Sequence, residues 1–354
     1  MDVRLIDNPP NPYESRHAEW LEPPPVARVR VYEEESRSIL SGNDSPDLPY
    51  RWSVNPYRGC QHACSYCYAR RTHEYLGHGA GTDFDTKLVA KVNAPELLRQ
   101  AFSKRSWRGE AVHFSGVTDC YQPLEASYEL TRRCLEVCLE FRNPACVVTK
   151  GFLVVRDAEL LAKLNKRTQV RVQISIPFAD AETCRLFEPH ASSPPRRFEA
   201  IRRLRAVGLP VGVLISPVIP GLTDADIPRI LEQAAAAGAT SASYTALRLP
   251  GSVADVFVKR LREVMPLRAD RVLNRLRDIH GGRLNDPRFG DRMRGHGPYW
   301  ESIRSLFEVS SRRFGFDDTA PSQCRDCIAQ APCGAPRPVD LGNSPPADQL
   351  MFDF

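Results

Sequence analysis

Apolar, β-branched segments alternate with helical patterns through the middle of this 354-residue chain. The segments that predict strands are 111–115, 145–149, 169–176, 211–218 and 240–246. The patterns that predict helices are 95–102, 125–139, 157–164, 195–206 and 226–237. Pro195 and Asp226 stand at or near expected helix starts, and Gly208 and Gly238 follow expected helix ends. This alternation predicts an α/β fold, a partial barrel of five or six units with a parallel sheet and its chemistry at the carboxyl ends of the strands.

The chain divides into four segments by composition. Residues 1–50 are rich in proline and charge and predict an extended or partly disordered lead-in, whereas 51–250 hold the alternating pattern of the barrel. Residues 317–354 are a tail rich in cysteine and proline. Residues 251–316 form a basic extension, in which arginine-faced amphipathic helices are expected at 253–264, 270–278 and 299–314.

Composition indicates the cellular setting. The chain shows no signal peptide and no apolar run near 18 residues, so we expect no membrane span and a cytoplasmic protein. Eleven cysteines in a cytoplasmic chain indicate metal or redox chemistry before disulfides.

Three of these cysteines, Cys60, Cys64 and Cys67, lie in one short run with the spacing C-x3-C-x2-C. Thiolates select iron–sulfur clusters, zinc or Cu(I). A structural zinc site or an electron-transfer cluster uses four protein ligands, and this run offers no fourth cysteine. The spacing therefore favours a [4Fe–4S] cluster with one open iron, where a substrate or cofactor can bind. A zinc loop and three unrelated buried thiols are the alternatives.

The run from Asn55 to Arg70, Asn-Pro-Tyr-Arg-Gly-Cys-Gln-His-Ala-Cys-Ser-Tyr-Cys-Tyr-Ala-Arg, resembles the cluster loop of the radical SAM superfamily. The resemblance implies a (β/α)6 partial barrel and a [4Fe–4S] cluster whose open iron is chelated by the amino and carboxylate groups of S-adenosylmethionine (SAM). It also implies reductive cleavage of SAM to methionine and a 5′-deoxyadenosyl radical. In such enzymes the cofactor performs the difficult chemistry, and the protein supplies orientation and dryness.

A narrower resemblance, to the spore photoproduct lyase-like or DNA repair photolyase-like branch, covers residues from about 50 to 310. Beyond the cysteine loop it rests on Thr-Asp-Cys-Tyr-Gln-Pro-Leu-Glu at 118–125, Val-Thr-Lys at 148–150 and Ser-Pro-Val-Ile-Pro-Gly-Leu-Thr-Asp at 216–224. These segments match the T-D-x-Y-Q-P-x-E element, the strand-end T-K and the P-x-x-P-G-x-x-D turn of that branch. The branch resemblance implies a lyase-like enzyme of DNA repair.

The resemblance assigns cofactor-binding roles to four residues. Tyr68, directly after the last cysteine, would pack beside the adenine of SAM, and Lys150, at a strand end, would pair with the SAM carboxylate. Asp119 and Ser175, also near strand ends, would form hydrogen bonds with the ribose or the methionyl group. The alternatives are a solvent-exposed Lys150 and an Asp119 that caps a helix.

Two residues are catalytic candidates. In spore photoproduct lyase a cysteine just before the T-x-D element returns a hydrogen atom to the product radical, but this chain has Val117 there. Cys120, three residues further on, is either a hydrogen donor or a small buried side chain. Tyr66 and Tyr68 flank Cys67 as the radical-relay tyrosines of the lyase do. The missing thiol at position 117 argues against direct repair of a thymine photoproduct.

Positive charge is concentrated in residues 259–313, where one lysine and thirteen arginines accompany seven acidic residues, although the whole chain carries a net charge of only +5. Such a region indicates a polyanionic partner, with nucleic acid as the first candidate. A general bias towards arginine is the alternative, because the chain has only seven lysines.

The tail carries two further motifs. Cys324, Cys327 and Cys333 have the spacing C-x2-C-x5-C, which predicts an auxiliary iron–sulfur cluster or zinc site with a fourth ligand from elsewhere. The last six residues, from Gln349 to Phe354, resemble the bacterial sliding-clamp-binding hexapeptide, whose apolar anchors enter a preformed groove. The alternative is that this peptide docks on the barrel of its own chain.

The resulting prediction is a radical SAM enzyme that repairs a DNA lesion or modifies a base. It would require a one-electron reductant such as flavodoxin or ferredoxin. Two alternatives stay open: a radical SAM maturase or modifying enzyme that acts on RNA or protein, and a non-catalytic metal-binding protein that binds nucleic acid.

Overall fold

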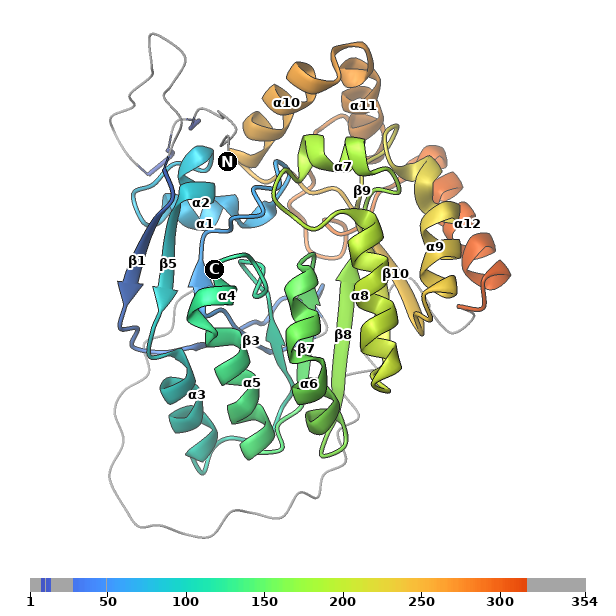
Figure 1. The fold of residues 1–354 in the computed structure, drawn as a ribbon. Helices are drawn as coiled ribbons and strands as arrows, with labels where there is room; N and C mark the ends of the chain where they lie inside the picture. The colour runs from blue at the N-terminus through green and yellow to red at the C-terminus, as the bar shows by residue number, and fades with distance from the viewer. Residues whose placement is uncertain (1–7, 10, 14–27, 49, 317–354) are drawn as a thin grey trace.

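The computed structural model describes residues 8–9, 11–13, 28–48 and 50–316, and its centre is a seven-stranded sheet of order β10-β9-β8-β7-β6-β3-β2 (Figure 1). The strands of this sheet are β2 (Leu40–Gly42), β3 (Trp52–Val54), β6 (Val112–Phe114), β7 (Ala145–Thr149), β8 (Val170–Ser175), β9 (Val211–Val218) and β10 (Ser241–Ala246). All are parallel except β2, which pairs antiparallel with β3 at one edge. The six parallel strands follow one another in space as they do in sequence, which confirms the predicted partial barrel.

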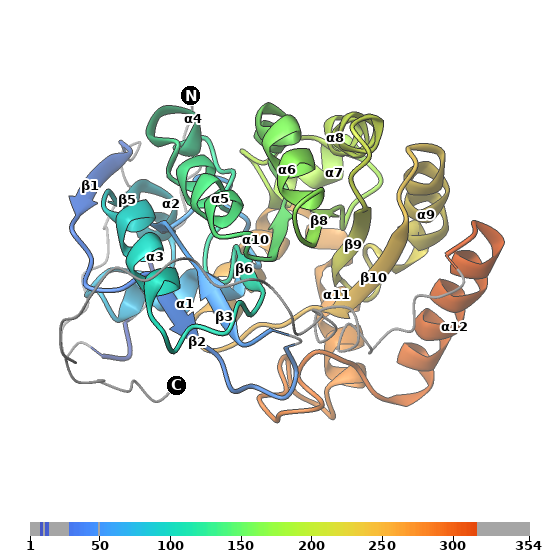
Figure 2. The same cartoon turned by 90° about the horizontal axis from the view of Figure 1, so that it is seen from below.

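Helices cover the outer face of this sheet (Figure 2). They are α3 (Ala94–Ser103), α5 (Leu130–Glu140), α6 (Ala158–Asn165), α8 (Pro194–Ala206), α9 (Ile227–Ala236) and α12 (Gly297–Arg313). Their apolar stripes face the sheet, as helical periodicity predicts, and fully bury Leu98, Leu135, Leu161, Leu204 and Ile230. The short helix α7 (Ala181–Phe187) follows β8. Short 3-10 helices lie at Tyr68–Arg70, Phe152–Asp157 and Asp224–Asp226.

The two faces of the sheet differ in polarity. Strand register places on one face a row of apolar side chains that belong to the core beneath the helices: Val54, Phe114, Val147, Val172 and Val211. Side chains alternate between faces along a strand. The opposite, concave face therefore carries Ser53, His113, Cys146, Arg171, Gln173, Ser216, Ser243 and Thr245, several of them partly exposed. The inside of the partial barrel is polar and partly open to solvent.

Two strands lie within the segment 1–50, where the sequence predicted only an extended or partly disordered lead-in. Strand β1 (Arg30–Glu34) pairs in parallel with β5 (Lys87–Lys91), which pairs antiparallel with β4 (Tyr57–Arg58) in a second sheet, and β2 joins the main sheet. The prediction missed β1 because an exposed edge strand with charged side chains lacks apolar alternation. The short helices α1 (Arg71–Glu74) and α2 (Thr82–Thr86) precede β5.

The helix expected at 125–139 is two helices, α4 (Glu125–Tyr128) and α5, separated by Glu129 in the left-handed conformation with φ of 51°. The carboxylate of Glu125 accepts hydrogen bonds from the backbone amides of Thr131 (2.9 Å) and Arg132 (3.1 Å). These amides belong to the first turn of α5, where intrahelical acceptors are lacking, so Glu125 caps the second helix and thereby breaks the first.

Two further helices, α10 (Val253–Val264) and α11 (Pro266–Ile279), pack against each other beside the barrel. The helix expected at 270–278 is part of the longer α11, which begins with a proline in its first turn, a favoured position. Phe257 and Leu273 share an apolar cluster with Phe178 and Phe187, which is separate from the core beneath the outer helices, so α10 and α11 pack on the segment that follows β8. Within the described ranges, no helix has the length and apolarity that crossing a bilayer requires. Cys324, Cys327, Cys333 and the hexapeptide from Gln349 to Phe354 lie outside the described residues, and the predictions made for them stay predictions.

Candidate active site

The three cysteines of the C-x3-C-x2-C run lie in one loop between β4 and the 3-10 turn Tyr68–Arg70. Cys60 is 6% exposed and Cys64 is 8% exposed, and Cys67 is half-buried. The amide of Cys67 donates to the carbonyl of Cys64 (3.3 Å), and the amide of Arg70 donates to the carbonyl of Cys67 (3.2 Å). These successive turns make the loop compact, so that three thiols lie within residues 55–67, directly after strand β3.

Gly59 is required at the entrance of this loop. Its φ is +73°, a conformation that side chains other than glycine rarely adopt. A Cβ atom at this position would lie 2.9 Å from the ring of His73, from the side chain of Leu88 and from the carbonyl oxygen of Phe84. The same carbonyl of Phe84 accepts a hydrogen bond from the amide of Cys60 (3.0 Å), so the backbone passes this point with no spare room.

Arg70 holds the loop from below. Its side chain is fully buried, and Nε donates to the carbonyl of Cys64 (2.9 Å). Nη1 donates to the carbonyls of Ala80 (2.9 Å) and Gly81 (2.8 Å), and Nη2 pairs with Asp85 at 2.7 Å. A guanidinium has five donors in a fixed plane, so one residue fixes the cysteine loop against the segment that precedes β5.

The T-D-x-Y-Q-P-x-E element holds the loop from the other side. Thr118 Oγ1 donates to the carbonyl of Gly59 (2.7 Å), and Gln122 Nε2 donates to the same carbonyl (3.2 Å). Gln122 Oε1 accepts from the amide of Gln61 (2.8 Å). The residues on both sides of Cys60 are therefore hydrogen-bonded to the loop that follows β6. The T-D-x-Y-Q-P-x-E element thus holds the cysteine loop in place.

The three thiols suit a cluster better than a single ion. Burial raises the pKa of all three, for Cys60 to about 12, so their deprotonation needs a cation such as cluster iron beside them. Thiolates around one zinc ion lie about 3.8 Å apart, because each Zn–S bond is about 2.3 Å long. Three potential ligand atoms within 4.8 Å of one another occur, in the described part of the chain, only at Asp286, Asp291 and His296. The three cysteine sulfurs do not all lie within 4.8 Å of one another, so the loop fits a polynuclear cluster better than the tight arrangement around one ion.

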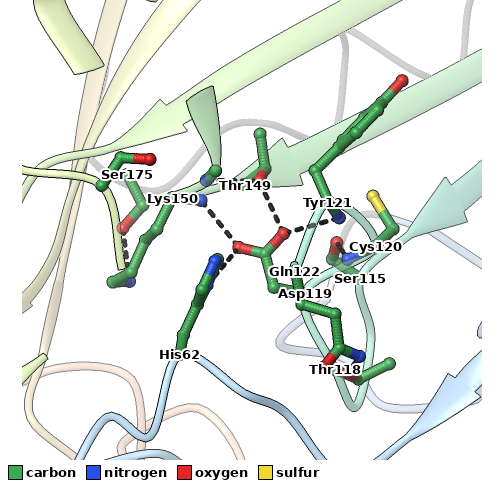
Figure 3. Close-up of polar contacts among 12 residues, drawn as sticks. His62, Ser115, Thr118, Asp119, Cys120, Tyr121, Gln122, Thr149, Lys150 and Ser175 are labelled. Carbon is green, nitrogen blue, oxygen red and sulfur yellow. Dashed lines mark hydrogen bonds and ion pairs between the residues drawn. The ribbon is translucent and has the colours of Figure 1, made fainter. Parts of the chain in front are cut away.

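Asp119 connects this loop to the strand ends (Figure 3). Its carboxylate accepts from Thr149 Oγ1 (2.6 Å), the amide of Lys150 (2.7 Å) and the amide of Tyr121 (2.9 Å), and it lies 3.3 Å from His62 Nδ1. Burial alone would raise the pKa of this carboxyl, but the charge of His62 and these hydrogen bonds outweigh burial and lower the pKa to about 2. Asp119 is thus an ionised group that ties the end of β7 to the cysteine loop.

Lys150, directly after β7, lies across the carboxyl ends of three neighbouring strands. Nζ donates to Ser175 Oγ at the end of β8 (2.8 Å) and to the carbonyl of Ser216 in β9 (3.4 Å). Ser175 Oγ donates in turn to the carbonyl of Ser216 (3.0 Å). The Lys150 side chain is only 15% exposed, which excludes the alternative of a freely solvated surface lysine.

A buried ion pair supports these groups, and the sequence did not predict it. Glu188 and Arg197 are 0% and 1% exposed, and they pair directly. Arg197 also donates to the carbonyl of Ser175 (2.9 Å). Glu188 accepts from the hydroxyl of Tyr66 and lies 3.9 Å from Lys150 Nζ. Glu188 and Arg197 belong to no short motif, and they meet only when α8 packs on the segment after α7, so local pattern offered no signal for them.

The two tyrosines of the loop, Tyr66 and Tyr68, differ in exposure. Tyr66 is 5% exposed, with its hydroxyl on Glu188 and its ring near Phe178. Tyr68 is 47% exposed and donates to the carbonyl of Gly116 (2.6 Å), so its ring presents a face next to Cys67 that a ligand can contact.

Cys120 is fully buried in the core beneath the helices, and Figure 3 shows its sulfur directed away from the carboxylate of Asp119. Its backbone amide donates to Ser115 Oγ at 3.0 Å. Complete burial among apolar side chains favours the packing interpretation that the sequence left open, because a hydrogen donor must reach its substrate. Of the six residues proposed for cofactor binding and catalysis, the structure brings Tyr66, Asp119, Lys150 and Ser175 into one bonded region beside the cysteine loop, with Tyr68 at its edge.

Comparison with known proteins agrees with this geometry. The family model described as "Radical SAM superfamily" matches residues 54–234, half of the chain. An uncharacterized protein of Mycobacterium tuberculosis is 39% identical over 235 residues, which cover 66% of this chain and 68% of that protein. The Radical SAM Nalpha-GlyT isomerase of Pseudomonas phage M6 is 26% identical over 213 residues, 59% of this chain and 42% of the phage protein.

Among solved structures, spore photoproduct lyase complexed with dinucleoside spore photoproduct aligns with a TM-score of 0.59 and 15% identity, over 81% of this chain and 80% of the lyase. At that identity the likeness establishes a common fold. The family model, which matches half of the chain, establishes that this chain belongs to the radical SAM superfamily.

Proposed function

We propose that this protein cleaves SAM reductively at a [4Fe–4S] cluster and acts on a nucleic acid, either to repair a DNA lesion or to modify a base. The observation that carries the first half is the loop of three thiols, two buried and one half-buried, beside Lys150 at the strand ends. When bound there, the cluster and SAM supply a one-electron cleavage that yields methionine and a 5′-deoxyadenosyl radical.

The residues of the chain then hold the reactants. Cys60, Cys64 and Cys67 would bind the cluster, and the Lys150 ammonium would neutralise the carboxylate of the methionyl group. Lys150 is suited to this because two oxygen acceptors fix its Nζ at the strand ends, so little conformational freedom is lost on binding. The exposed ring of Tyr68 would stack on the adenine.

Asp119 and Ser175 act in this proposal as positioning residues. Both carboxylate oxygens of Asp119 already accept bonds from protein groups, and one of these donors is the amide of Lys150 itself. Ser175 accepts from Lys150 Nζ. Their effect on SAM would therefore pass through the position of Lys150.

Three observations support a nucleic acid as the substrate. The concave face of the barrel is polar and partly open, as recognition of a polar base requires. Net positive charge is concentrated in residues 259–313. The fold is shared with a lyase that was solved with a dinucleoside photoproduct. The departure at Val117, where the lyase has a thiol, leads us to propose a different nucleic acid reaction from direct repair of that photoproduct.

The test is formation of 5′-deoxyadenosine by anaerobically reconstituted protein with SAM and dithionite, measured by mass spectrometry. We expect product from the parent protein and from Cys138→Ala, which removes an equally buried thiol from α5, and none from Cys64→Ala. Addition of damaged or modified DNA should increase the yield. If only RNA or a protein extract increased it, the maturase alternative would replace the proposal, and absence of SAM binding would favour the non-catalytic one.

A further inference from the structure

Arg248 stands at the edge of the candidate active site and has no anionic partner among the residues that the structure describes. It is the second residue after β10, the last strand of the barrel, and its guanidinium carbon lies 5.8 Å from the ring centroid of Tyr68. The backbone around it is fixed, because the amide of Leu247 donates to Val218 (3.0 Å) and the amide of Leu249 donates to Asn285 Oδ1 (3.1 Å). The guanidinium therefore has a defined place beside the ring that follows the last cluster cysteine.

The bonding of this guanidinium is incomplete. Nε is buried and has no hydrogen-bond partner, and Nη1 reaches only the sulfur of Met293 at 3.6 Å, a weak acceptor. In the part of the chain that the structure describes, no carboxylate lies within ion-pair distance of Arg248. Arg248 is partly exposed and only its Nε is enclosed, so its outer nitrogens are open to an anion supplied from outside.

Asp47, the acidic residue whose charge acts on Arg248, does not fill this role. Asp47 pairs with Nε of Arg292 and accepts from the amide of Gly290 at 2.6 Å, so its carboxylate is already committed. Arg292 also donates to Ser45. Of two neighbouring arginines, one is neutralised within the protein and the other, Arg248, is not.

We propose that Arg248 binds a phosphate group of the nucleic acid substrate, next to the SAM position. This inference rests on the function proposed above. A guanidinium recognises phosphate through two parallel donors, and both Nε and the outer Nη atoms of Arg248 lack strong acceptors.

The SAM carboxylate is a less suitable anion for this site. That carboxylate must lie at the cluster, and Lys150 is the cation held at the strand ends beside the cysteine loop, where its Nζ donates to Ser175 Oγ (2.8 Å) and to the carbonyl of Ser216 (3.4 Å). Arg248 lies instead against the ring of Tyr68. Lys150 is therefore placed to bind SAM, and Arg248 is placed to bind the substrate that lies beside SAM.

The experiment measures how DNA binding depends on salt. The reconstituted protein with bound SAM is titrated into a fluorescein-labelled DNA duplex by anisotropy at several salt concentrations, for the parent, Arg248→Gln, Arg248→Lys and the control Arg202→Gln. Arg202 lies on the outer surface of α8 and is 55% exposed. Each phosphate contact contributes about 0.9 to the slope of log K against log salt.

We expect Arg248→Gln to reduce this slope by about one and to weaken binding at least about tenfold at low salt, with partial recovery in Arg248→Lys. Arg202→Gln should keep the parent slope. Iron content and SAM affinity, measured on the same samples, report whether the variant is folded and loaded.

Two results would overturn the inference while leaving the proposed function intact: an unchanged slope in Arg248→Gln, or a loss of SAM affinity in that variant with DNA binding unaltered. If the loaded parent protein itself shows no salt-dependent binding to DNA or RNA, the proposed nucleic acid substrate fails, and the inference fails with it.

Discussion

The buried pair of Glu188 and Arg197 should be the most sensitive point of the site's support. Replacement of Arg197 by methionine keeps the aliphatic volume but leaves the Glu188 carboxylate buried, with Lys150 at 3.9 Å as its one remaining cation in the described part of the chain. Removal of one partner from a buried pair typically costs about 3–5 kcal/mol. Arg197 also satisfies the carbonyls of Ser175 (2.9 Å) and Ser192 (2.6 Å), so we expect a loss of about 4 kcal/mol or more.

The assay is thermal unfolding of the reconstituted protein by circular dichroism, at matched iron content. At an unfolding entropy of about 2.1 cal/mol/K per residue, about 1 kcal/mol shifts the midpoint of a 354-residue chain by about 1.3 °C, so Arg197→Met should lower it by about 5 °C or more. The double variant Arg197→Met/Glu188→Gln should recover a large part of this loss, because the amide is uncharged and can still accept from Tyr66. The control Arg202→Met removes an exposed ion pair with Glu199 from the same helix and should leave the midpoint unchanged.

A midpoint for Arg197→Met within about 3 °C of the parent would refute the reasoning, since it would mean that Glu188 does not need its buried partner. Strict additivity of the two single changes in the double variant would also refute it. In that case the two residues would stabilise the protein independently, contrary to the direct contact between them.

Three further outcomes are expected. Gly59→Ala should reduce the iron bound after reconstitution, measured against protein concentration, because the new Cβ would lie 2.9 Å from three neighbouring atoms; a normal iron content would contradict the assigned loop geometry. Asp119→Asn should be less stable than the parent by about 2 kcal/mol above pH 4, since a pKa lowered to about 2 adds stability that is fully present above the unfolded value and is lost as the pH falls towards 2. A difference in unfolding free energy between the two proteins that stayed constant down to pH 2 would contradict this expectation. Cys120→Ala should still form 5′-deoxyadenosine from SAM, because its sulfur lies in the core; a loss of product at normal iron content would restore it as a candidate catalytic residue.

The sequence predicted the parts of the fold whose signal is local. Buried parallel strands such as Ala145–Thr149 and Val211–Val218 read as continuous β-branched runs, and they were located without error. The edge strand Arg30–Glu34 was missed because its stability comes from pairing with Lys87–Lys91, which apolar periodicity does not record. The helix break at Glu129 was missed for a similar reason, because it depends on where one carboxylate directs its hydrogen bonds.

The candidate site shows the same division. Cys60, Asp119 and Lys150 belong to contiguous motifs, because a cluster loop and two strand ends must each be built from neighbouring residues. Thr118 and Gln122 belong to the T-D-x-Y-Q-P-x-E element, but only the structure shows that both donate to the carbonyl of Gly59. Much of that motif therefore fastens the cysteine loop and need not touch a ligand.

The groups that would meet a substrate arise from a different constraint, and this explains why they are scattered. On the concave face, the side chains of Arg171 and Gln173 form no hydrogen bond or ion pair with any residue that the structure describes, although both project from the strand that ends at Ser175. The proposed function requires that the cysteine loop and Lys150 be held rigidly, and Asp119, Arg70 and the buried pair hold them without using this face. Side chains that make no contact needed for folding are free to vary with the ligand that the protein binds. Together with Arg248 at the rim, which has no anionic partner among the described residues, they are the groups to which we propose that a polar, anionic substrate binds, with the cofactor at the strand ends.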